Sequence, residues 1–145
     1  MAKFFDHLPK IAVVLFVVGG AVVLVSKFNG GGAATELVNV TLPTSLSAKA
    51  QRGARTFAEN CAACHGDNAS GSDKGPPLIH DIYNPGHHGD ESFYLAMKTG
   101  VRQHHWPYGN MPPQTQVNTT MAGNILAYVR EVQAANGIVY REHRM

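Results

Sequence analysis

The sequence Cys61-Ala62-Ala63-Cys64-His65 contains both cysteines of a chain of 145 residues. Two cysteines are too few for a disulfide scaffold, and their spacing places the two thiols about one helical turn apart. Two thiols followed directly by an imidazole can hold a metal or a cofactor, or can carry out thiol–disulfide exchange. The surrounding sequence distinguishes these uses.

The neighbours of this motif favour covalent haem. Zinc needs four ligands, and because no further cysteine exists, only His87/His88 or His104/His105 could complete a zinc site. A dithiol redox pair is expected within a βαβ unit, whereas the residues before this motif are typical of a helix. Haem uses the whole motif, since each thiol can add to a vinyl group and the imidazole can ligate iron. We therefore expect one covalent haem c.

A helix is predicted just before the motif, over residues 48–59. It is rich in helix-forming residues, its apolar positions follow the helical period, and Ser45 or Ser47 can cap it. Gly53 lies in its middle, where glycine costs about 0.5–1 kcal/mol relative to alanine. We expect that this glycine lets another helix cross closely.

Two more helices are predicted after the motif. A short one has Asp90 as its N-cap and ends at Gly100. A longer one, capped by Asn118 or Thr119, has an apolar stripe and ends near residues 136–137. The longer helix is the expected partner of Gly53, and the pattern as a whole predicts an all-α fold.

Five short sequence segments are each common in proteins, but their occurrence together in this order is not. Together they resemble the class I c-type cytochromes, from about residue 47 to residue 135. The resemblance implies the class I cytochrome c fold around one covalent haem. The segments are Gly53-x-x-x-Phe57-x-x-x-Cys61, Cys61-Ala-Ala-Cys64-His65-Gly66, Gly75-Pro76-Pro77-Leu78, Asn110-Met111-Pro112-Pro113 and Ile125-Leu126-Ala127-Tyr128-Val129.

The resemblance also implies roles for individual residues. Cys61 and Cys64 would form the haem thioethers and His65 would be the proximal iron ligand. The Pro76 carbonyl would accept a hydrogen bond from the second ring nitrogen of that histidine, which fixes the tautomer and the ring plane. Met111, which precedes a proline in the loop before the last helix, would be the distal ligand.

The residues themselves also favour a methionine as the distal ligand. Met111 lies in a turn-rich loop, where a purely structural methionine has little to pack against, whereas Met97 and Met121 have helical spacing and are expected in the core. His104 and His105 are the alternative ligands, and an open iron is a third possibility. The choice matters because a second imidazole would give a lower potential than a thioether.

Aromatic and apolar residues are expected around the haem. Trp106 and Tyr108 have polar tips that could bind the haem propionates, although both could equally be ordinary core aromatics. Leu78 is expected to join Phe93 and Met97, which share one helix face, in apolar packing against the haem.

Histidines are frequent between the two expected iron ligands. Paired histidines on loops can bind copper or zinc. The simpler interpretation, which we adopt, is that they are solvated loop residues and form no second metal site. These residues are His80, His87, His88, His104 and His105.

An uncharged, apolar run over residues 11–26 predicts a membrane helix. Its 16 residues would span about 24 Å as a helix, short of a hydrocarbon core of about 30 Å unless flanking residues extend it. Lys3 and Lys10 before the run, against Lys27 after it, favour a cytoplasmic N-terminus and a periplasmic head. A cleaved signal peptide, with cleavage near Ala34, is the alternative.

The expected organisation is an anchor at residues 1–28, a flexible tether at 29–46 and a cytochrome c domain at 47–145. The formal net charge of +2 and the lack of any dense Lys/Arg cluster exclude a typical nucleic-acid binder.

We expect electron transfer on the periplasmic side of the inner membrane, between membrane-bound redox complexes such as a quinol-oxidising donor and an oxidase, with no small-molecule substrate. The protein would act as a carrier or as a haem subunit of one such complex. The alternatives are a haem enzyme or gas-binding protein with an open distal site, and a His-rich metal-binding protein.

Overall fold

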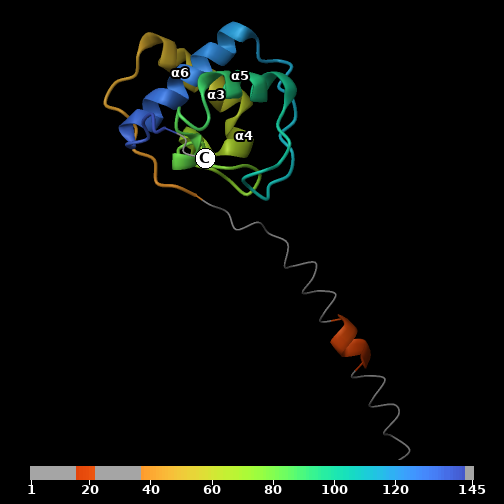
Figure 1. Cartoon of the computed structure of the whole chain (residues 1–145). Coiled ribbons are helices and arrows are strands. Elements are labelled where there is room, and N and C mark those ends of the chain that lie inside the picture. The colour runs from red at the N-terminus through yellow and green to blue at the C-terminus, as the bar shows by residue number, and fades with distance from the viewer. Residues whose placement is uncertain (1–15, 22–36, 143–145) are drawn as a thin grey trace, which may run out of the picture. The chain divides into compact units, whose positions relative to one another are not determined.

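The computed structural model describes residues 16–21 and 37–142, which fall in two units, residues 1–32 and 33–145 (Figure 1). In the first unit, residues 16–21 are helical and exposed. No helix within the described residues is long and apolar enough to cross a membrane. Most of the anchor predicted at residues 1–28 lies outside the described residues.

The second unit is helical, which confirms the predicted all-α class. Residues 37–142 contain no strand, and their one β-bridge is an isolated antiparallel one between Val101 and Met111. The helices are α3 (Ala48–Asn60), α4 (Ala62–His65), α5 (Asp90–Thr99) and α6 (Thr119–Ala135), with two 3₁₀ turns, η1 (Asp67–Ala69) and η2 (Asp81–Tyr83).

The crossing of α3 and α6 builds the core. Within the described residues, these two helices share the most extensive contact of any pair of elements (Figure 1). Gly53 lies at the crossing, where a Cβ atom would overlap the backbone carbonyl of Asn124. Phe57 packs beside Tyr128 with ring centroids 5.6 Å apart. The close crossing expected from Gly53 is therefore present.

Replacing Gly53 with alanine is expected to destabilise the protein by roughly 1–3 kcal/mol, because the overlap is with backbone atoms that no rotamer change can relieve. Chemical denaturation of the haem-loaded protein, followed by circular dichroism, measures the loss.

Gly123→Ala is the matched control, because Gly123 is also buried, in α6. Its added Cβ would meet only the ends of movable side chains, the Tyr94 hydroxyl at 3.1 Å and the Lys49 ammonium at 3.8 Å. Alanine there should be neutral or stabilise by up to about 1 kcal/mol. Equal effects of the two substitutions would show that the Gly53 crossing is not a tight contact.

The helix ends agree with the predictions except at one cap. Ser47 caps α3 by accepting a hydrogen bond from the Ala50 amide, and Asn118 caps α6. The N-cap of α5 is Gly89, and Asp90 is its first helical residue, so the predicted Asp90 cap is wrong by one position. A carboxylate in the first turn still interacts favourably with the helix dipole.

Residues 37–46 are held by the domain, which differs from the flexible tether expected at 29–46. The Val38 amide donates to the Ser70 carbonyl (3.0 Å), and Thr41 exchanges two hydrogen bonds with the Asn136 side chain (2.9 and 2.8 Å). Val38, Val40 and Leu46 pack on the core. These contacts fix a segment that has no periodic pattern of its own.

Candidate haem site

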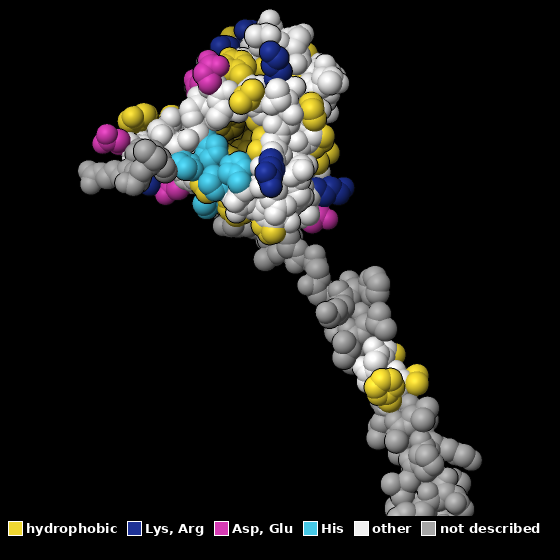
Figure 2. Space-filling view, turned by 45° about the vertical axis from the view of Figure 1, so that its right-hand side comes forward, with side chains coloured by type: hydrophobic (Ala, Val, Ile, Leu, Met, Phe, Trp, Pro, Cys, Tyr) yellow, Lys and Arg dark blue, Asp and Glu magenta, His cyan; other side chains and the backbone are white. Residues whose placement is uncertain are grey.

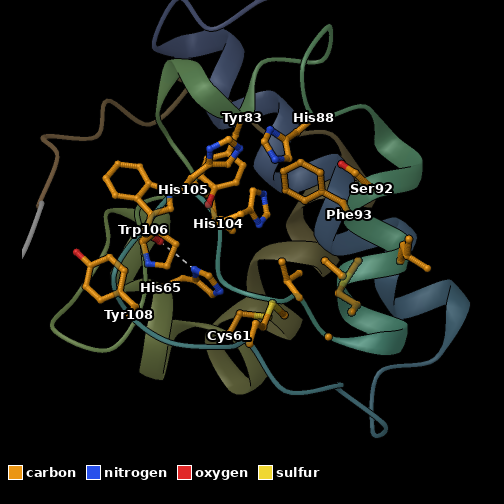
Figure 3. A pocket seen from close by; sticks show the side chains of 18 of the residues that line it. Cys61, His65, Tyr83, His88, Ser92, Phe93, His104, His105, Trp106 and Tyr108 are labelled. Carbon is orange, nitrogen blue, oxygen red and sulfur yellow. Dashed lines mark hydrogen bonds between the residues drawn. The ribbon is translucent and has the colours of Figure 1, made fainter. Parts of the chain in front are cut away.

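A largely apolar cavity of about 450 Å³ lies inside the second unit. Figure 2 shows an opening into the interior beside the histidine side chains, and Figure 3 shows the side chains that surround the cavity. Its walls come from all four helices of this unit and from residues of the segments 76–88 and 100–111. The volume is typical of a cofactor pocket.

The cysteine–histidine motif forms the junction between α3 and α4. The Cys61 amide donates to the Phe57 carbonyl at the end of α3, and the Cys61 carbonyl accepts from the His65 amide in α4 (2.8 and 2.9 Å). Cys61 is half-buried and lines the cavity. Cys64 is exposed and does not belong to the cavity wall.

The environment of Cys61 does not suit thiol redox chemistry. Burial, reinforced by the neighbouring Cys64, raises the pKa of the Cys61 thiol to about 11. Reactive cysteines instead have a lowered pKa, because the thiolate is the nucleophile. Within the described residues, no group of three or more metal-binding side chains includes either cysteine, so nothing there completes a zinc site.

His65 reaches the cavity from the end of α4 (Figure 3). Its Nδ1–H donates to the Pro76 carbonyl over 2.9 Å, which holds the ring and directs the other nitrogen, Nε2, away from that carbonyl. Burial lowers the pKa of the imidazole, and this hydrogen bond only partly opposes the shift. The neutral ring that results at neutral pH is the form that ligates a metal.

Met111 lies on another part of the cavity wall, in the isolated bridge. Its amide and carbonyl each pair with Val101 over 3.0 Å. Gly100, just before the bridge, has φ of +77°, and a Cβ there would overlap the Met111 carbonyl. Position 100 therefore needs a glycine, because a side chain there would prevent the close approach of the Gly100 backbone to the Met111 carbonyl.

Trp106 and Tyr108 also line the cavity, as do Pro76 and Leu78. Within the described residues, the buried Trp106 Nε1–H has no partner at hydrogen-bonding geometry, although it lies near the Tyr83 hydroxyl. Burial raises the pKa of Tyr83 to about 12, and the neighbouring Trp106 opposes that rise. A buried donor in a cavity wall is a place for an acceptor group of a bound molecule.

Two residues of α6 that the sequence analysis did not single out hold the loop over residues 78–89. The Arg130 guanidinium donates to the Tyr83 and His88 carbonyls (2.9 and 2.6 Å) and pairs with Asp90 at 2.9 Å. Gln133 is fully buried and donates to the Leu78 carbonyl at 2.9 Å. The sequence signal for this role was that two polar residues, three positions apart, lie in a largely apolar helix.

Four of the histidines between the two expected iron ligands lie together, whereas we expected separate, solvated loop residues. His104 and His105 are exposed, whereas His87 and His88 are half-buried, and the rings of these four lie against one another. Burial and the neighbouring imidazoles lower the pKa of His88 and of His105. No pattern in either pair indicated that the two pairs would meet.

These features fit a covalently held haem. The cavity offers a thiol, a carbonyl-anchored neutral imidazole, a thioether on a separate segment and a buried N–H donor in an apolar wall. They define a helical domain built to enclose a haem c. The cytochrome c family profile matches residues 50–133, which is more than half of the chain. The chain belongs to the cytochrome c family, whose members carry covalent haem and transfer electrons.

One curated protein is similar to this chain over a short stretch. The chain is 54% identical over 41 residues to the cbb3-type cytochrome c oxidase subunit FixP of Bradyrhizobium sp. (strain ORS 278). The match covers 28% of this chain but only 14% of that subunit, so it concerns a small part of a longer protein. No solved structure matches the chain significantly.

Proposed function

We propose that the protein is a monohaem cytochrome c with His/Met iron ligation, which passes electrons between membrane-bound redox complexes on the periplasmic side. When bound, haem c supplies an iron that cycles between Fe(II) and Fe(III). The chain would hold it through thioethers at Cys61 and Cys64. His65 would be the proximal ligand and Met111 the distal one.

The other cavity residues would position the cofactor. The Pro76 carbonyl orients the His65 ring, and Leu78 contributes apolar surface that excludes water. Trp106 would donate its buried N–H to a haem carboxylate, and Tyr108 lies beside it with ring centroids 6.4 Å apart. These residues bind and orient, and none is proposed to carry out chemistry on a substrate.

The hydrogen bond between His65 and Pro76 is the observation that carries this proposal. It anchors one ring nitrogen at 2.9 Å, while burial keeps the imidazole neutral inside an apolar cavity that also contains Cys61. A reactive dithiol would need a lowered thiol pKa, and a structural zinc site would need four ligands, which the described residues do not bring together at the two cysteines.

A potentiometric titration of the full-length holoprotein tests the electron-transfer function. We expect a single reversible one-electron transition, together with negligible turnover of hydrogen peroxide. Two separate transitions would contradict the monohaem proposal. Steady peroxide consumption would favour the haem enzyme with an open distal site.

Replacing Gly100 with alanine is expected to displace Met111 from the iron, because the new Cβ would overlap the Met111 carbonyl. The near-infrared charge-transfer band of the oxidised protein, which reports sulfur ligation, should weaken strongly.

Gly109→Ala is the matched control for this substitution. Gly109 also has a positive φ, of +87°, so alanine costs about 1–2 kcal/mol there as well, but its Cβ would meet no atom within 4 Å. The band should persist in this variant. A band that survives Gly100→Ala unchanged would contradict the assigned role of the Met111 loop.

We further propose a membrane-anchored protein with a cytoplasmic N-terminus and a periplasmic haem domain. The apolar run at residues 11–26, the lysine asymmetry and the likeness to a subunit named for an oxidase support this location. A quinol-oxidising complex as donor and an oxidase as acceptor are the corresponding partners. The domain could serve as a carrier or as a fixed subunit of one of them.

Mass spectrometry of the haem-bearing chain from the membrane fraction tests the anchor. We expect to find Met1, because the small residues that could be cleaved lie far beyond the apolar run. A mature N-terminus near Ala34 would instead make the protein a soluble carrier.

A further inference from the structure

Four histidines from two loops gather on one patch of the surface, at the edge of the haem cavity. We call them the histidine cluster: His87, His88, His104 and His105. One pair lies in the turn before α5 and the other in the segment before Trp106, and Figure 2 shows histidine side chains side by side next to the opening. Of the four, all but His87 line the cavity (Figure 3).

The spacing within the cluster suits a single metal ion. The Nε2 atoms of His87 and His105 lie 3.4 Å apart. Two imidazole nitrogens bound tetrahedrally to one Zn²⁺ at about 2.0–2.1 Å are separated by about 3.3 Å. Ligand atoms of His87, His88 and His105 all lie within 4.8 Å of one another, so small side-chain rotations would bring the third nitrogen into place.

The ring of His88 is already oriented for ligation. Its Nδ1–H donates to the Ile82 carbonyl over 2.7 Å, which leaves Nε2 as the nitrogen available to a metal. Ligating histidines almost always have such a partner on the second nitrogen. Arg130 holds the His88 carbonyl from α6 and is itself paired with Asp90, so the loop is fixed and the guanidinium charge is balanced nearby.

We propose that His87, His88 and His105 bind one divalent transition-metal ion of the imidazole-preferring class, for which Zn²⁺ is the representative. Three imidazole ligands suit Zn²⁺, Cu²⁺ or Ni²⁺ far better than Mg²⁺ or Ca²⁺, which prefer oxygen ligands. The fourth position would be taken by water or by His104, whose Nδ1–H donates to the Arg102 carbonyl at 2.8 Å. This site is separate from the iron ligands proposed above.

A cation bound in the cluster would lie at the wall of the haem cavity. A nearby positive charge stabilises the reduced form of a redox centre, because reduction lowers the net positive charge there. Zinc binding is therefore expected to raise the midpoint potential of the haem. The zinc concentration around the protein would then affect how readily the haem accepts an electron.

Equilibrium dialysis of the oxidised full-length holoprotein against ZnCl₂ tests the site. We expect one Zn²⁺ per chain in the wild type, and an affinity at least tenfold weaker in His87→Gln and in His105→Gln. Mg²⁺ should not bind. His80→Asn is the matched control, because it removes a histidine outside the trio and retains a side chain that can cap η2.

The same samples separate loss of the zinc site from loss of haem ligation. Each variant should retain the near-infrared band of the wild type, and zinc should raise the potential of the wild type and of His80→Asn only. The proposal is overturned if the wild type binds no zinc, if the glutamine variants bind as tightly as the wild type, or if His80→Asn is weakened equally. Loss of the band in His105→Gln would assign that residue to the iron and would also overturn it.

Discussion

Met111→Ala is expected to abolish the near-infrared sulfur-to-iron band, lower the midpoint potential and open the reduced iron to carbon monoxide. The reason is that a thioether stabilises Fe(II), and alanine has no atom that could replace it. Met111 is held on the cavity wall by its bridge to Val101 and is followed by Pro112, which stiffens the loop. Backbone damage from this substitution should be small, since the bridge uses main-chain atoms.

Met97→Leu is the matched control, because Met97 is a buried methionine that also lines the cavity. A volume-conserving change there should cost less than about 1.5 kcal/mol and leave the band intact. The ligand assignment is wrong if Met97→Leu removes the band. It is also wrong if His104→Ala or His105→Ala, rather than Met111→Ala, opens the iron.

Cys61→Ala and Cys64→Ala are each expected to yield little haem-bearing protein and a largely unfolded apo-chain. A domain of about 100 residues whose core surrounds a cavity of about 450 Å³ depends on the cofactor to fill it, and an empty apolar cavity of that size costs far more than a small domain can tolerate. Haem staining of denaturing gels and circular dichroism of the helices measure the two effects.

Ala63→Ser changes the exposed residue between the cysteines and should behave as the wild type. Acid–acetone extraction provides the complementary check on the wild type, since thioether-bound haem stays with the polypeptide. Colour that passes into the organic phase would disprove covalent attachment.

The helices and the cavity wall were predictable because each depends on local signals. Ser47 and Asn118 are caps that precede periodic apolar runs, and Gly53 marked the close crossing. Pro76 was placed by resemblance, Leu78 by its apolar character and Met111 by both its loop and the resemblance, and the structure locates all three on one cavity with His65.

The parts that could not be predicted depend on contacts distant in sequence. Residues 37–46 have no period of their own and are ordered by Ser70 and Asn136. The loop carrying His88 is positioned by Arg130, 42 residues further along the chain. The meeting of the two histidine pairs follows from that loop, and no pattern in either pair could indicate it.

The visible spectrum of the reduced full-length holoprotein, recorded before and after addition of carbon monoxide, tests the central claim most directly. A six-coordinate iron held by His65 and Met111 should give the sharp bands of a low-spin cytochrome c, and carbon monoxide should leave them unchanged. A spectrum that converts to a carbon monoxide adduct would show an open distal position. That result would contradict a simple electron-transfer protein and would favour a gas-binding or catalytic haem site.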